Sequence, residues 1–68
     1  MIPITVNGTP RDVDDGLTVA SLLSQLGIPE QMALAIERNR SVLPRSTWPE
    51  VKVGAGDVFE VVSLVGGG

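Results

Sequence analysis

The segment VFEVVSLV, residues 58–65, decides how this chain of 68 residues folds. Successive side chains of a β-strand point to opposite faces of a sheet. One face of this segment carries Val58, Glu60, Val62 and Leu64, and the other carries Phe59, Val61, Ser63 and Val65. Because both faces are largely apolar, the segment is typical of a strand in the middle of a sheet. We therefore expect residues 58–65 to form a central strand.

The opening of the chain predicts a β-hairpin. Ile2, Ile4 and Val6 alternate with other residues, which is the period-two pattern of a strand with one buried face. Asn7-Gly8 follows, and this pair favours a type I′ turn because both residues tolerate a positive φ. Residues 9–13 would then return as the second strand.

A short amphipathic helix comes next. The apolar residues that recur at the spacing of one helical face are Val19, Leu22, Leu23 and Leu26. The Thr18 hydroxyl can cap the helix N-terminus, Gly27 can take the left-handed position after its end, and Pro29 prevents any continuation. A helix of about nine residues is marginal alone, so we expect it to be held by packing on the sheet.

The remainder predicts two further strands. Residues 33–37 are expected as the third strand, and residues 42–43 as a short return strand after a turn at Asn39-Arg40. Residues 45–49 are irregular, with one helical turn, and Trp48 is expected to cover an edge of the core. Arg45, like Trp48, is assigned a structural role.

This order of elements predicts an α+β fold in which a mixed sheet of four to five strands packs on one helix. Since a crossover between parallel strands is right-handed, the economical packing places the first and last strands adjacent and parallel in the middle of the sheet. This is the β-grasp, or ubiquitin-like, arrangement. We expect a single β-grasp domain over residues 1–65, followed by a flexible glycine tail at residues 66–68.

The composition limits what such a domain can do. The chain has neither cysteine nor histidine, so the usual nucleophiles, general bases and metal ligands are largely missing, and no metal site is expected. With 5 basic and 8 acidic residues it carries a net charge of −3, which disfavours nucleic acid as a partner. No apolar run approaches the roughly 20 residues of a membrane span. We expect a cytoplasmic protein that is not itself an enzyme and binds no cofactor.

The chain ends in Gly66-Gly67-Gly68. A frayed terminus is one interpretation of such a tail. The other is a slim stem that threads a narrow channel, because glycine lacks Cβ and lets two backbones approach closely. Three extended residues reach roughly 10 Å. The stem would carry one reactive group, the Gly68 carboxylate, which becomes an electrophile once a partner enzyme adenylates it with ATP.

The sequence resembles the ThiS family, the small sulfur carriers of thiamine biosynthesis, over nearly its whole length. The pieces that carry the resemblance are ITVNG (4–8), DGLTVASLL (15–23), ALAIERN (33–39), VLPRSTW (42–48), GDV (56–58) and the final Gly67-Gly68. The chain departs from the family pattern in its third glycine and in the acidic residue Glu37. Neither departure touches the terminal chemistry.

The resemblance implies a scheme of partners. A ThiF-like adenylyltransferase would activate the Gly68 carboxylate with ATP, and a sulfur donor such as a cysteine desulfurase would convert it to a thiocarboxylate. A ThiG-like thiazole synthase would then take up the tail and pass the sulfur into the thiazole ring. In this scheme Gly68 carries the sulfur, while Gly66 and Gly67 form the stem that is inserted.

Partner enzymes also need a docking surface, and the sheet face left free by the helix is the natural one. Either Phe59, Val61 and Val65 or Val62 and Leu64 would supply it, and the sequence leaves both sets open. Two other functions also remain open at this point. The chain could carry sulfur for another pathway, such as molybdopterin synthesis, or it could be a non-covalent β-grasp binding module whose tail is incidental.

Overall fold

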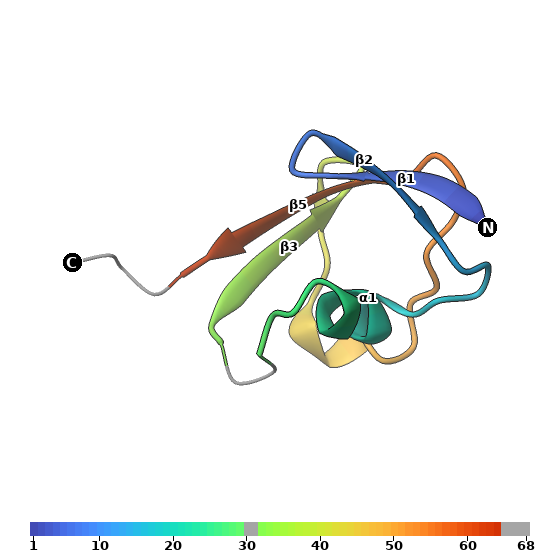
Figure 1. Cartoon of the computed structure of the whole chain (residues 1–68). Helices are drawn as coiled ribbons and strands as arrows, with labels where there is room; N and C mark the ends of the chain where they lie inside the picture. Colours follow the sequence, from blue (N-terminus) through green and yellow to red (C-terminus); the bar gives the residue numbers. More distant parts are fainter. Residues whose placement is uncertain (30–31, 65–68) are drawn as a thin grey trace.

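A computed structural model describes residues 1–29 and 32–64 of the chain. It forms a five-stranded mixed sheet in the order β2-β1-β5-β3-β4, packed on one α-helix (Figure 1). Strands β1 and β5 are adjacent and parallel at the centre of the sheet, and the other neighbouring strands pair antiparallel. The expected β-grasp arrangement is therefore confirmed. Its elements are β1 (Ile2–Val6), β2 (Thr9–Val13), α1 (Val19–Gln25), β3 (Leu34–Arg38), β4 (Ser41–Val42), the 3₁₀-helix η1 (Arg45–Thr47) and β5 (Val58–Ser63).

Two tight turns set the register of the two hairpins. Asn7 and Gly8 both have positive φ, at 49° and 80°, and they connect paired residues of β1 and β2. Asn39 and Arg40 repeat this geometry between β3 and β4, with φ of 50° and 72°. The second turn places Arg40 in the left-handed region, where a bulky side chain is strained. Glycine is usually found at such a position.

Both ends of α1 are capped as the sequence predicts. The Thr18 hydroxyl accepts a hydrogen bond from the Ser21 amide at 3.1 Å. Gly27 adopts a φ of 75° beyond the C-terminus, where its amide donates to the Ser24 carbonyl and the Ile28 amide donates to the Leu23 carbonyl. These two bonds form a Schellman motif, which satisfies carbonyls that the helix leaves free.

The core lies between α1 and one face of the sheet. Phe59, Leu22, Ile36 and Val19 are its largest fully buried side chains. Trp48 is also buried, and its indole nitrogen donates to the Leu43 carbonyl at 3.0 Å. The guanidinium of Arg45 lies 5.0 Å from the centre of the Trp48 ring, which fits the structural role expected for both residues.

Several boundaries differ from the sequence-based expectation by one or two residues. β3 covers Leu34–Arg38 instead of 33–37, because Arg38 pairs with Phe59 on β5 and with Ser41 across the Asn39-Arg40 turn. The return strand β4 is correspondingly Ser41–Val42 instead of 42–43. β5 ends at Ser63, and residue 65 lies outside the described residues. No helix within residues 1–29 and 32–64 is long and apolar enough to cross a membrane.

Candidate functional site

The end of β5 is the root from which the predicted glycine tail continues, and it is fixed to β3. Leu34 lies opposite Ser63 in the antiparallel ladder. The Leu64 amide donates to the Ala33 carbonyl at 2.8 Å, so the pairing reaches the last described residue of this part of the chain. Figure 1 shows this end of β5 on the side of the molecule away from the N-terminus. The predicted reactive residue Gly68 and the stem, Gly66 and Gly67, lie outside the described residues.

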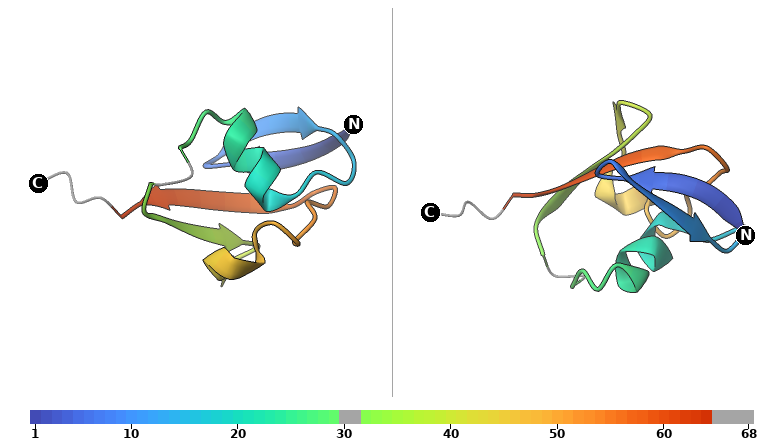
Figure 2. Two further views of the ribbon diagram at one scale, coloured as in Figure 1. Left: turned by 90° about the horizontal axis from the view of Figure 1, so that it is seen from below. Right: turned by 45° about the horizontal axis from the view of Figure 1, so that its top comes forward.

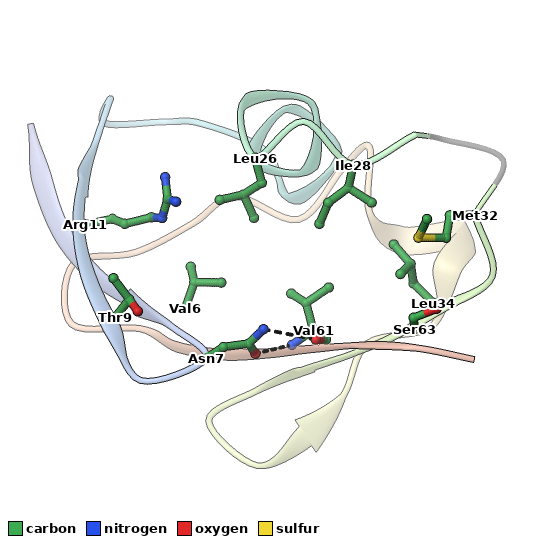
Figure 3. Close-up of a pocket in the computed structure, with 10 residues that line it drawn as sticks. All are labelled: Val6, Asn7, Thr9, Arg11, Leu26, Ile28, Met32, Leu34, Val61 and Ser63. Carbon is green, nitrogen blue, oxygen red and sulfur yellow. Dashed lines mark hydrogen bonds between the residues drawn. The ribbon is translucent and has the colours of Figure 1, made fainter. Parts of the chain in front are cut away.

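The other side of β5 is held by a side chain. β1 has turned away after Val6, but the Asn7 amide group continues the ladder beside β5 (Figure 3). Its Oδ1 accepts from the Val61 amide at 2.8 Å, and its Nδ2 donates to the Val61 carbonyl at 3.1 Å. The Asn-Gly pair predicts the turn but not this second role, which depends on how far β5 extends past β1.

The two faces of β5 differ sharply in burial. Phe59 is fully buried beneath α1, and Val61 on the same face is half-buried. Phe59 therefore belongs to the core and cannot contribute to an exposed docking surface, which corrects its inclusion among the candidates. On the opposite face Val62 and Leu64 are 54% and 61% exposed. Val65, the remaining candidate, lies outside the described residues.

We call the exposed sheet surface opposite α1 the open face. Figure 2 shows α1 on one side of the sheet, with the open face on the other. The large apolar side chains exposed on this surface are Val42, Val58, Val62 and Leu64. Exposed apolar groups that gather on one face are typical of protein interaction sites. The open face also runs directly to the root of the tail at Leu64.

A hollow of about 380 Å³ opens on the helix side of the sheet, near the end of β5 (Figure 3). Its lining is mainly apolar, with Arg11 and Thr9 at one end. The residues that line it pair no nucleophile with a general base. Its floor is formed by Val6, Leu34 and Val61 and its roof by Leu26, Ile28 and Met32.

The chemistry of the remaining described residues is equally sparse. In residues 1–29 and 32–64 no group of three or more His, Cys, Asp or Glu side chains could hold a metal ion. An ion pair joins Arg38 and Asp57 at 3.8 Å, and this pair lies at the end of β5 remote from Leu64.

Comparisons with known proteins agree with this geometry. The sequence profile of the ThiS family matches residues 4–68. The crystal structure of a thiamine biosynthesis protein (ThiS) from Geobacter metallireducens superposes with a TM-score of 0.82 at 36% identity, covering 98% of this chain and 100% of that one.

Longer proteins contain a similar segment. Two proteins named thiazole synthase, from Paramagnetospirillum magneticum and Magnetococcus marinus, are 37% and 41% identical to this chain over 65 and 66 residues. The matches cover 96% of this chain, which spans only 20% of the length of either relative.

Proposed function

The chain belongs to the ThiS family, and from this membership we propose that it is a sulfur carrier for thiazole formation in thiamine biosynthesis. Gly68 is the carrying residue in this proposal. Its carboxylate attacks the α-phosphorus of ATP on an adenylyltransferase and releases pyrophosphate, which yields an acyl adenylate. Hydrosulfide, released from the persulfide of the sulfur donor by a thiol reductant, then displaces AMP and leaves a thiocarboxylate.

The observation that carries the proposal is the anchoring of the chain along β5 and up to Leu64. Leu64 is bonded to β3, and the Asn7 side chain holds Val61 from the other side. The four residues beyond Leu64 span at most about 14 Å when extended. A fixed root and a short stem let an enzyme that binds the domain receive the chain end at a defined depth.

The thiazole synthase partner is supported by the longer relatives. Two proteins named thiazole synthase contain a segment similar to nearly all of this chain. A carrier segment and the synthase that uses its sulfur would benefit from being part of one protein, because the segment is then held at high local concentration. We therefore propose a ThiG-like synthase as the acceptor and a ThiF-like enzyme as the activator, with a cysteine desulfurase as sulfur source.

Intact mass spectrometry tests this function. The protein is incubated with the adenylyltransferase, ATP and a sulfide source, and we expect a mass gain equal to the difference between one sulfur and one oxygen atom. The matched controls are a variant without Gly68 and a variant with one residue added after it, both of which should keep the circular dichroism of the parent. Absence of the gain in the parent protein, or its persistence in both controls, would refute the proposal. The first result would favour a non-covalent binding module.

A further inference from the structure

Two acidic side chains lie directly opposite each other at the centre of the open face. Glu37 on β3 is in register with Glu60 on β5, and both are exposed. In the ladder between β3 and β5, the Leu64 amide donates to the Ala33 carbonyl and the Asn39 amide donates to the Val58 carbonyl. Hydrogen-bonded pairs alternate with non-bonded pairs along such a ladder, so Glu37 and Glu60 form a hydrogen-bonded pair as well. The Cα atoms of such a pair are about 5.5 Å apart, and both side chains leave the sheet on the same side.

Neither carboxylate is neutralised within the described part of the chain. Glu37 and Glu60 take part in no side-chain hydrogen bond and no ion pair among residues 1–29 and 32–64. The ion pair that does exist there joins Arg38 and Asp57, and Arg38 alternates with Glu37 to the opposite side of β3. Like charges directly opposite each other destabilise a sheet, so the pair opposes folding of the free protein.

Apolar side chains surround this acidic pair. Val62 follows Glu60 on the same face of β5 in the direction of the tail, and Val58 precedes it. Val42 on β4 lies opposite Glu37. A protein that covers these valines also removes water from the carboxylates between them. An ion pair formed there is stronger than one in bulk water, and a missing partner charge is correspondingly costly.

We propose that the open face docks the adenylyltransferase through an arginine of that enzyme, which enters between Glu37 and Glu60 while apolar side chains around it cover Val62 and Leu64. The guanidinium suits this place because its planar fork offers several N–H donors to two carboxylates at once. This inference rests on the proposed function, since it concerns the enzyme that must seat the domain while its active site receives the tail. The open face meets the tail root at Leu64, so both contacts fit one binding event.

The same charges disfavour other occupants of the open face. In a symmetric dimer through this face, the acidic pair of one copy would meet an equally acidic face of another. The chain also has a net charge of −3, which opposes association with nucleic acid or an anionic membrane. Charge complementarity therefore selects a basic protein surface.

The test measures binding of the carrier to the adenylyltransferase by calorimetry, at low salt and at high salt. The variants are Glu37→Gln, Glu60→Gln and the double variant, and Glu50→Gln is the matched control because Glu50 is exposed but lies outside the sheet. We expect the double variant to bind at least about tenfold more weakly than the parent and to lose most of the salt dependence. Glu50→Gln should change the affinity less than about twofold.

A stability measurement separates docking from a structural role. Removing one of two opposed like charges should leave the melting temperature of each single variant equal to or above that of the parent. If the glutamates instead stabilise the free fold, the melting temperature will fall, and the inference is wrong. Unchanged affinity of the double variant for the enzyme would overturn it as well.

The sulfur-transfer assay distinguishes this inference from the proposed function. The double variant should still reach the parent's rate of thiocarboxylate formation at saturating carrier concentration, with a KM raised at least about tenfold. If the parent protein itself forms no thiocarboxylate, the proposed function fails. If the parent reacts and the double variant has the parent's KM, only the docking inference fails.

Discussion

Replacing Asn7 by glycine removes the side chain that holds β5 where β1 has already turned away. The Val61 amide and carbonyl point away from β3, because Val61 and Ile36 fall between the hydrogen-bonded pairs of that ladder. Both groups bond to Asn7, at 2.8 and 3.1 Å. Glycine is the suitable replacement, since it retains the positive φ of 49° at this position without strain.

The size of the effect follows from the two lost bonds. Each contributes about 0.5–1.5 kcal/mol net, and both are exposed, which places them in the lower half of that range. The larger freedom of glycine in the unfolded chain adds about 0.5 kcal/mol. We expect Asn7→Gly to lower the free energy of unfolding by roughly 1.5–2.5 kcal/mol. In a domain of this length that corresponds to a decrease in melting temperature of roughly 6–20 °C.

Amide hydrogen exchange provides the specific readout. The Val61 amide should lose far more protection than the Leu64 amide, which remains bonded to β3. Asn39→Gly is the matched control, because Asn39 also has a positive φ and its Oδ1 accepts from the Val58 amide. That control should expose Val58 and leave Val61 protected. If Val61 in Asn7→Gly exchanges as slowly as in the parent, Asn7 does not hold this part of β5.

Three further substitutions, two of them with a control variant, test the fold that supports the site. Thr18→Ala removes the hydroxyl that accepts from the Ser21 amide and should lower the free energy of unfolding, measured by urea denaturation, by about 1 kcal/mol. Thr18→Ser keeps a hydroxyl at this position and should retain most of the parent's free energy of unfolding. Arg40→Gly relieves a φ of 72° and should raise the free energy of unfolding by about 0.5–1 kcal/mol; a lower melting temperature would contradict the strain at this turn. Phe59→Ala leaves a cavity at the fully buried centre of the core and should lower the free energy of unfolding by about 3–5 kcal/mol. We expect its far-ultraviolet circular dichroism to be that of a largely unfolded chain. Val62→Ala, the control on the exposed face of the same strand, should have a free energy of unfolding within about 0.5 kcal/mol of that of the parent.

Local signals were sufficient to predict the topology. The first turn and both caps of α1 involve residues whose chemistry is specific to that conformation, namely Asn7-Gly8 in the turn and Thr18 and Gly27 at the ends of the helix. The boundaries of β3 and β4 were less accurate, because they depend on pairing. Arg38 is a strand residue because it pairs with Phe59 on β5 and with Ser41, which lies across a turn that contains no glycine.

The candidate surface could be predicted only as two alternatives. Alternation along residues 58–64 separates the faces of β5 but does not say which face α1 covers, since Phe59 and Val62 are both suited to a core. The structure decides this by burying Phe59 and exposing Val62. The opposition of Glu37 and Glu60 was inaccessible for another reason. These residues are far apart in the sequence, and only the register of β3 against β5 brings them together.

The anatomy of β5 therefore lets folding and docking be altered independently along one strand. Phe59 and Val61 face α1, whereas Glu60 and Val62, which alternate with them along the strand, face outward. A substitution at an outward position changes what a partner meets without opening a cavity, because successive side chains leave the strand on opposite sides. Loss of enzyme binding in a Glu60 variant that keeps its melting temperature would thus report on the interface, whereas the same loss in a Phe59 variant would report on the fold.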